Sequence, residues 1–268
     1  MLSPFYRLHS FIGFFALLIT MSAYGQDRQY VVSEKVKIGR AYAYVVTADL
    51  ASSHVDLGLF VATHHPSNHL FPHETFASMI SKTNPTAAIN GTYYDTKTFI
   101  PVGTLASHGQ MLQRGTHGIA VCFDKNNRVG FYKVKDLKNF PWQNFKVVIS
   151  TGPTLVESGH IHLFPRTERF HDRDIFKLNR RSAIGVTKNN KLLIVAVRTP
   201  VGLRDLAWIM RKLGAIHAVS LDGGSSTGLY YRGKYLIRPS RQQTNIFMVY
   251  EDRETRISKN IPDEGSKI

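Results

Sequence analysis

The feature that most constrains the fold is a succession of short apolar runs, each ended by glycine, asparagine or other polar residues. Short runs rich in Val, Ile and aromatic residues between turn signals are typical of β-strands. The sequence predicts strands at residues 42–48, 55–61, 87–90, 119–123, 129–134, 147–150, 182–187, 192–197, 217–221, 229–231 and 246–250. The pairs Asn126-Asn127 and Asn189-Asn190 each separate two of these runs, so a hairpin turn is expected at both.

Helical spacing is clear in only one place. Apolar residues recur every three or four positions over residues 203–213, and Gly214 follows as a C-terminal cap. Residues 74–82 form a second candidate helix, which begins after Pro72 and ends before Pro85. With no internal repeat or proline-rich linker, the sequence predicts one α+β domain at residues 26–250, with a strand-rich mixed sheet core and a few packed helices.

The N-terminus has the pattern of a secretory signal peptide. Arg7 precedes an apolar run at residues 11–19, and the small residues of Ala23-Tyr24-Gly25 follow. The run is too short for the roughly 20 residues that span a bilayer. We therefore expect residues 1–25 to be removed, and the mature protein to be periplasmic or secreted with no membrane association. Residues 251–268 are charged and nearly free of apolar side chains, which predicts a solvated tail.

The charge balance indicates an anionic partner. The chain has 34 Lys and Arg against 19 Asp and Glu, a formal net charge of +15. Nucleic acid, an acidic surface and a phosphorylated substrate all fit such a charge. Nucleic acid is the least expected of them, because the basic residues are scattered and form no basic helix or aromatic-basic stripe.

Metal binding receives little support from the sequence. The single cysteine, Cys122, excludes an intramolecular disulfide and a site built from several thiolates. Four histidines lie close together at positions 64, 65, 69 and 73, but prolines interrupt the segment and no acid joins them at ligand spacing. A polar loop is the favoured interpretation. No metal ligand is predicted, and the need for a cofactor is left open.

Four polar clusters at strand ends are candidates for chemistry. The most informative is Asp222-Gly223-Gly224-Ser225-Ser226, where two glycines allow a sharp turn that presents N–H groups beside two hydroxyls. Such a turn suits an anion or a sugar hydroxyl, although glycine pairs also form ordinary turns. The other three clusters are the segments at residues 90–95, 150–156 and 180–185.

Taken in order, these clusters resemble the phosphodiester glycosidase family. The matching segments are residues 89–95 (INGTYYD), 152–156 (GPTLV), 181–185 (RSAIG), 206–207 (LA) and 221–226 (LDGGSS), followed by Arg241 and Asn245. Each motif is weak alone, but together they extend over residues 40–250.

The resemblance implies a hydrolase of carbohydrate metabolism that cleaves a sugar-1-phosphodiester at the glycosidic C1–O bond. It implies that Arg181, with Arg241, holds phosphate oxygens, and that the amides and hydroxyls of residues 223–226 donate to the same group. Asp222 and Asp95 become the candidates for the carboxylate that activates water or stabilises an oxocarbenium-like centre. The remaining residues of the expected substrate site are Asn90, Gly91, Gly152 and Asn245.

Two other classes of protein fit the same residues. A non-catalytic carbohydrate-binding domain of the cell envelope would use the glycine-rich turn for sugar hydroxyls. A polyanion-binding surface protein would follow from the positive charge alone, and its binding would weaken with salt.

Overall fold

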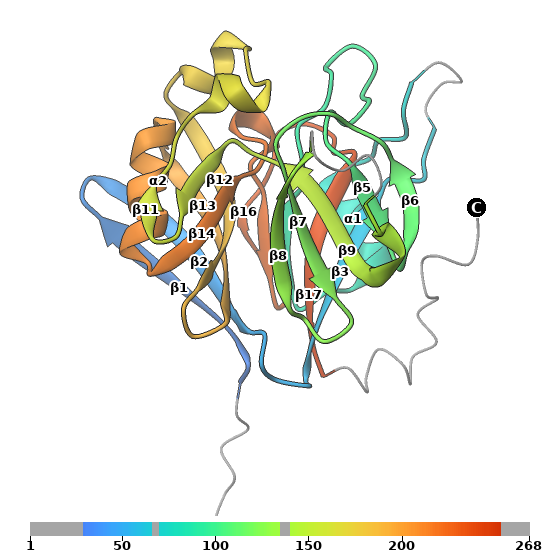
Figure 1. Cartoon of the computed structure of the whole chain (residues 1–268), viewed down its shortest axis with the longest axis horizontal. Coiled ribbons are helices and arrows are strands. Elements are labelled where there is room, and N and C mark those ends of the chain that lie inside the picture. Colours follow the sequence, from blue (N-terminus) through green and yellow to red (C-terminus); the bar gives the residue numbers. More distant parts are fainter. Residues whose placement is uncertain (1–28, 66–69, 135–139, 253–268) are drawn as a thin grey trace, which may run out of the picture.

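The computed structural model describes residues 29–65, 70–134 and 140–252 (Figure 1). The expected signal peptide lies outside these ranges, as do His69 and residues 253–268 of the expected tail. In the described part of the chain, the strands form three sheets that are accompanied by two α-helices. The expected fold class, a single strand-rich α+β domain with a few packed helices, is confirmed.

The largest sheet has seven strands, and its neighbouring strands pair antiparallel. In spatial order they are β1 (Val31–Ile38), β2 (Ala41–Asp49), β13 (Lys191–Val201), β12 (Asn179–Thr187), β14 (Ala215–Ser220), β10 (Thr154–Glu157) and β11 (His160–Ile161). Val186 pairs with Leu192 across β12 and β13. The expected hairpin at Asn189-Asn190 is therefore confirmed.

The other two sheets have five strands each and are also antiparallel. One contains β16 (Lys234–Ile237), β15 (Leu229–Tyr231), β4 (Ala87–Asn90), β17 (Asn245–Glu251) and β3 (Val55–Val61). The other contains β6 (Gln110–Gln113), β5 (Leu105–Ser107), β9 (Phe145–Thr151), β7 (Ile119–Asp124) and β8 (Val129–Lys133). Phe123 pairs with Val129, which confirms the hairpin at Asn126-Asn127.

One apolar core joins all three sheets. It takes Val46 from the first sheet, Phe247 from the second and Phe123 from the third, each almost inaccessible to solvent. The Phe123 and Phe247 rings lie 5.5 Å apart, so the second and third sheets meet through direct aromatic contact. Each large side chain buried in this way contributes about 1.5–3 kcal/mol.

The two helices cover the outer faces of two sheets. Helix α2 (Leu203–Lys212) packs on the first sheet through its buried apolar residues, and the Asp205 carboxylate accepts the Gly202 N–H at 3.0 Å. Helix α1 (Phe76–Thr83) covers the second sheet. Thr75 caps it by accepting the Ser78 N–H at 3.1 Å, so it begins two residues later than expected. No helix in the described ranges is long and apolar enough to cross a membrane.

Strand β17 corrects the expected boundary between the domain and its C-terminal tail by one residue. Glu251 belongs to β17 rather than to the solvated tail, and its carboxylate accepts the Val31 N–H at 3.2 Å and pairs with Arg232. These contacts fasten the end of the domain to its first strand, which is why the ordered structure extends past the expected boundary.

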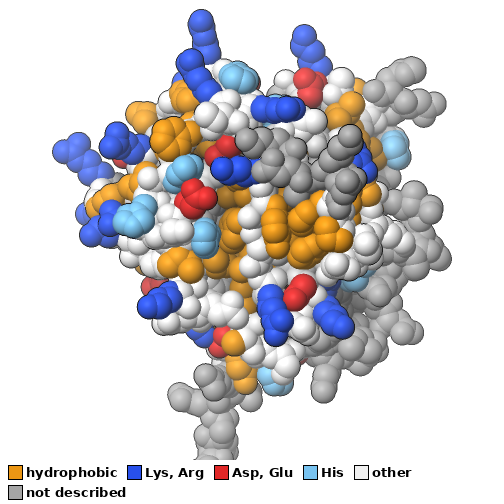
Figure 2. Space-filling model, viewed as in Figure 1, with side chains coloured by type: hydrophobic (Ala, Val, Ile, Leu, Met, Phe, Trp, Pro, Cys, Tyr) orange, Lys and Arg blue, Asp and Glu red, His pale blue; other side chains and the backbone are white. Residues whose placement is uncertain are grey.

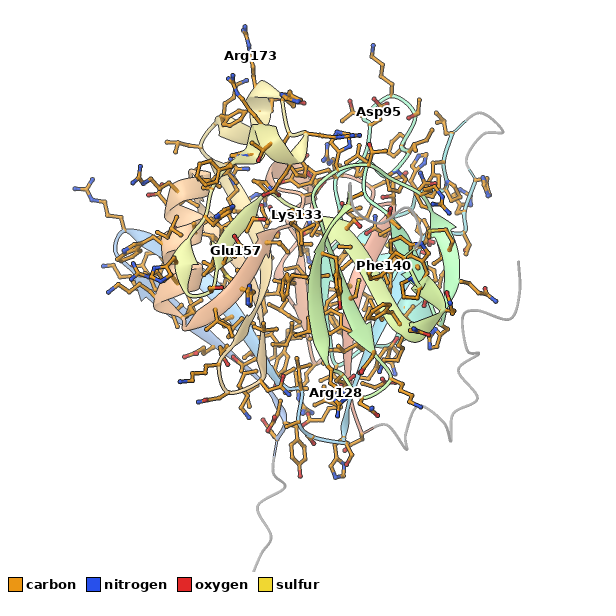
Figure 3. The ribbon with its side chains drawn as sticks, viewed as in Figure 1. Asp95, Arg128, Lys133, Phe140, Glu157 and Arg173 are labelled. Carbon is orange, nitrogen blue, oxygen red and sulfur yellow. The ribbon has the colours of Figure 1, made fainter. Side chains whose placement is uncertain are left out.

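Two loops rise above the sheets at the top of Figure 1, one at residues 91–104 and the other at residues 162–178. Figure 3 labels Asp95 on the first loop and Arg173 on the second. On the face shown in Figure 2, Lys and Arg side chains are dispersed, whereas hydrophobic side chains gather near the centre. The positive charge therefore forms no single patch on this face.

Candidate active site

A cavity of about 550 Å³ lies where the two loops meet the turn that follows β14. A volume of this size is typical of pockets that hold a whole small ligand. Among the residues that line it are several that the sequence singled out, namely Asp95, Arg181, Asp222, Gly223, Gly224, Ser225 and Arg241. The structure thus brings together residues from four separate parts of the chain.

Asp222 is a buried carboxylate in this cavity, with 6% of its surface exposed. It lies two residues after the end of β14, and its Oδ1 accepts the Gly223 N–H at 2.8 Å. Its Oδ2 lies 2.6 Å from Arg241 Nη2. The glycine-rich turn therefore holds the carboxylate by its own backbone on one side and by a cation on the other.

The electrostatics of Asp222 combine two opposed effects. Burial raises the pKa of the carboxyl group, while the Arg241 guanidinium and the Ser226 hydroxyl lower it, and burial is the larger effect. Arg241 is itself held in place, since its Nε donates to Ser226 Oγ and its guanidinium lies 4.7 Å above the Tyr94 ring. The result is a desolvated acid beside a fixed positive charge.

Arg181 differs from the expectation that its guanidinium grips phosphate with two nitrogens. The side chain is buried, with 2% of its surface exposed. Its Nε donates to the Val201 carbonyl at 3.2 Å, and its Nη2 donates to the carbonyls of Ile175 and Lys177. Only Nη1 is left, and it lies near Gly223. In this structure the guanidinium ties the loop at residues 162–178 to the end of β13.

Asp95 stands at the exposed rim of the cavity and shapes its own loop. Its Oδ1 accepts the N–H groups of Lys97 and Thr98 at 2.9 and 2.8 Å and the Thr98 hydroxyl at 3.0 Å. These hydrogen bonds hold the pKa of the Asp95 carboxyl group below its usual range. Asp95 is thus an ionised side chain that stabilises a turn, whereas Asp222 is buried.

Asn90 lies beneath the cavity and joins two sheets. Its side chain is fully buried. The Asn90 Nδ2 donates to the Asp222 carbonyl at 2.7 Å, and its Oδ1 accepts from Ser182 Oγ at 2.7 Å and from the Gly228 N–H at 3.1 Å. One amide at the end of β4 therefore fixes the glycine-rich turn against β12.

Gly91 and Asn245 complete this support. The Gly91 N–H donates to the Asn245 carbonyl at 3.0 Å, and Asn245 Oδ1 accepts the Thr92 N–H at 3.0 Å. A Cβ atom on Gly91 would lie 1.6 Å from Asn245 Oδ1, so only glycine allows this approach. Gly152 lies outside the cavity lining, where a Cβ atom would meet Glu168 Oε2 at 2.9 Å. These residues support the site from below.

The sequence analysis missed the part of the cavity wall that comes from the loops. His117, Arg169 and His171 line the cavity together with Tyr93 and Phe170. Tyr93 lies inside the first recognised motif and offered a signal. The loop at residues 162–178 carries no strand or helix periodicity and only short 3₁₀ turns, so no pattern pointed to its side chains.

In the described ranges, no group of three or more His, Cys, Asp or Glu side chains is arranged to hold a metal ion. His73, one of the clustered histidines, is buried and stacks on Phe99 at 3.6 Å between ring centroids. Its Nδ1 lies 2.8 Å from the Phe71 carbonyl. Ring stacking and a backbone contact explain why His73 is buried here.

Comparisons with known proteins place the chain in a family. The model of the phosphodiester glycosidase family matches residues 83–250, which is more than half of the chain. A search of curated proteins gave no match.

Solved structures share the fold at low sequence identity. A protein from Synechocystis matches with a TM-score of 0.69 and 15% identity over 82% of this chain, which spans 62% of that protein. The catalytic domain of zebrafish N-acetylglucosamine-1-phosphodiester alpha-N-acetylglucosaminidase, auto-inhibited by its pro-peptide, matches with a TM-score of 0.66 and 16% identity, covering 84% of this chain and 85% of that one. A Burkholderia pseudomallei protein described as exported has a TM-score of 0.59 and 14% identity, with 78% of this chain and 74% of that one covered. The fold, the ordered motifs and the family match together show that this chain belongs to the phosphodiester glycosidase family.

Proposed function

We propose that this protein hydrolyses a sugar-1-phosphodiester at the glycosidic C1–O bond. The observation that carries the proposal is the buried Asp222 carboxylate, held between the Gly223 N–H and Arg241 in a cavity large enough for a small ligand. The zebrafish enzyme of similar fold is named for removing N-acetylglucosamine from such a phosphodiester. Family membership and a shielded carboxylate together favour catalysis over simple sugar binding.

The chemistry needs one well-placed carboxylate. When the C1–O bond breaks, its electron pair leaves with the phosphate oxygen, and a phosphate monoester has a second pKa of about 6, so it departs without full protonation. Positive charge then develops on the sugar ring, which a nearby carboxylate offsets. In this proposal a water oxygen bonds to C1 and its proton passes to Asp222, while Asp95 keeps the rim loop in shape.

The surroundings of Asp222 suit this task. A charge that is buried before substrate arrives needs little reorganisation during the reaction, and its interactions are stronger away from water. Arg241 lies against the carboxylate and offsets part of the rise in its pKa that burial causes. The glycine-rich turn supplies backbone at the cavity surface, where side chains would block access.

The test is a panel of sugar-1-phosphodiesters in which release of the free sugar is measured, assayed with and without chelator for the parent and for Asp222→Asn. We expect turnover by the parent and a loss on the order of 100-fold or more in kcat for the variant. Burial of the ionised carboxylate disfavours folding, so the variant should keep or slightly raise the thermal midpoint. Unchanged turnover with a lowered midpoint would show that Asp222 only supports its own turn. Sugar binding without turnover by the parent would favour a carbohydrate-binding domain.

We also propose that the protein is exported and that residues 1–25 are removed. The short apolar run and the small residues that follow it support this proposal. Mass spectrometry of the protein recovered from the cell envelope should find an N-terminus near Gln26. An intact Met1 in the membrane fraction would contradict it.

A further inference from the structure

A cluster of basic side chains lines the same cavity as Asp222 and takes no part in the mechanism above. His117 precedes β7, while Arg169 and His171 come from the loop at residues 162–178. The two segments are joined, because the Gly118 N–H donates to the Glu168 carbonyl at 3.2 Å. The His117 ring also packs edge-on against Phe170, with 5.8 Å between centroids. His117 and the backbone of this loop are therefore fixed parts of the wall.

Arg169 is the charged group of this cluster. Burial and the nearby Arg169 guanidinium lower the pKa of His117, while a hydrogen bond to the Val102 backbone raises it, and the net direction is down. Within the described residues, Arg169 forms no ion pair and no side-chain hydrogen bond. An anion bound beside the guanidinium would supply the missing counter-charge.

The acids of the cavity have other partners. Asp222 pairs with Arg241 at 2.6 Å and Asp174 pairs with Lys177 at 2.6 Å. Asp172 accepts the Asp174 N–H at 2.8 Å to cap a 3₁₀ turn, and Asp95 stabilises the turn described above. Within the described residues, none of these carboxylates forms an ion pair with Arg169.

The two arginines that the sequence assigned to phosphate already form hydrogen bonds within the protein. Arg181 donates from Nε and Nη2 to backbone carbonyls. Arg241 donates from Nε to Ser226 and from Nη2 to Asp222. Each keeps only Nη1, so neither offers the two-nitrogen fork that suits a phosphate. Arg169 keeps its whole fork.

We propose that Arg169, supported by His117 and His171, binds the phosphoryl group of the substrate, while the Asp222–Arg241 pair acts on the sugar. This inference rests on the function proposed above. A guanidinium fork can meet two oxygens of a phosphodiester anion at once. His117 places a polar ring in the same wall, where its Nδ1 lies 3.2 Å from Thr116 Oγ1 and the ring also hydrogen-bonds the Val102 backbone.

This proposal also places the two parts of the substrate at opposite ends of the cavity. The sugar lies over the glycine-rich turn with C1 near Asp222, and the phosphoryl group lies toward the loop at residues 162–178. The group beyond the phosphate then points to the exposed side of that loop. Selectivity for a phosphodiester over an ordinary glycoside would come from the loop rather than from the family motifs.

The experiment compares Arg169→Gln with Arg173→Gln, which removes a charge from an exposed position of the same loop outside the cavity lining. One measurement is the affinity for phenyl methyl phosphate, a phosphodiester without a sugar. The other is kcat/KM for release of the free sugar from the best sugar-1-phosphodiester. Arg169→Gln should weaken both by on the order of 10-fold or more, since charge-assisted hydrogen bonds are lost. Arg173→Gln should stay within about twofold of the parent, because a single exposed charge contributes little at physiological salt.

The outcomes separate the two proposals. Parent-like affinity and turnover in Arg169→Gln would overturn the phosphate assignment and leave the hydrolase proposal intact. If the parent turns over no sugar phosphodiester but binds the probe through Arg169, the hydrolase proposal fails and the anion site stands. An equal loss in both variants would show a general charge effect and also overturn the assignment.

Discussion

At the scale of single residues, two arginines near the cavity show that the same type of side chain can have different roles. Arg181 is buried and bonded to the carbonyls of Val201, Ile175 and Lys177, while Arg169 is exposed in the cavity. From the sequence, Arg181 was the stronger candidate for phosphate, because it begins a recognised motif. Its hydrogen bonds are long-range contacts that no local pattern reveals.

Arg181→Lys should therefore lower stability. The ammonium cannot reach carbonyls on two separate segments, and each buried carbonyl left unpaired costs about 1–3 kcal/mol. The role in phosphate binding expected from the sequence predicts instead a much larger loss of activity than of stability. Urea denaturation of the variant should give a lowered midpoint, and Arg180→Lys on the same strand provides the matched control. A parent-like midpoint together with a large loss of kcat/KM would restore Arg181 to phosphate binding.

Sequence reasoning placed the motif residues at strand ends correctly, in one region around the cavity. Asp222 and Asn90 follow apolar runs, and the ends of buried strands meet where sheets join. The pattern could not separate residues that line the cavity from those that support it, because both are small or polar and both follow a strand. Only the burial of Asn90 and its three hydrogen bonds distinguish the two roles.

At the scale of elements, periodicity found the buried strands and the amphipathic helix α2. It missed β1, an edge strand that exposes Glu34, Lys35 and Lys37 along most of its length. Charged residues are common on edge strands because they discourage pairing with other chains, and they hide the alternation that marks a strand. The short strands β5, β6, β10, β11 and β16 were also missed, each of them only two to four residues long.

Glu74, just before α1, gives a prediction about pH. Burial raises the pKa of its carboxyl group, but Lys82 at 2.6 Å, with the Ser78 hydroxyl and the Thr63 N–H, lowers it below its usual range. A lowered folded pKa stabilises the fold above the ordinary pKa, and that advantage is lost as pH falls through the folded value. At neutral pH, Glu74→Gln should cost about 1–3 kcal/mol of unfolding free energy.

The difference between parent and Glu74→Gln should shrink between about pH 5 and pH 3, as the parent carboxylate becomes protonated. Chemical denaturation at several pH values measures it. Glu34→Gln, at an exposed position of the edge strand β1, serves as control and should show a much smaller pH-dependent difference. A constant difference for Glu74→Gln across this range would show that its ion pair does not stabilise the helix.

At the scale of the whole molecule, Cys122 reports on opening of the domain. It is the only cysteine in the chain, and it is fully buried on β7. Burial raises the pKa of its thiol to about 12, so very little reactive thiolate is present at neutral pH. A thiol reagent should label the native protein only through opening, at a rate that increases with urea in parallel with unfolding.

The measurement is the labelling rate by mass spectrometry at increasing urea, compared with unfolding followed by tryptophan fluorescence. Rapid complete labelling without denaturant would show that the third sheet opens by itself. Labelling that follows global unfolding would show that the three sheets, which share one apolar core, lose their structure together.

The Asn90 amide has a consequence for protein engineering. Its three hydrogen bonds fix the Asp222 turn to two sheets from below, and none of them involves the loops at residues 91–104 and 162–178. Gly91 accepts the Asp222 N–H at 3.1 Å and Tyr94 packs on Arg241, so both must be kept. A library that varies the rest of those loops in length and composition, while also keeping the Glu168 and Arg181 anchors, would leave the reacting carboxylate where it is. Variants that accept new leaving groups can then be selected without changing Asp222 or the Asn90 contacts beneath it.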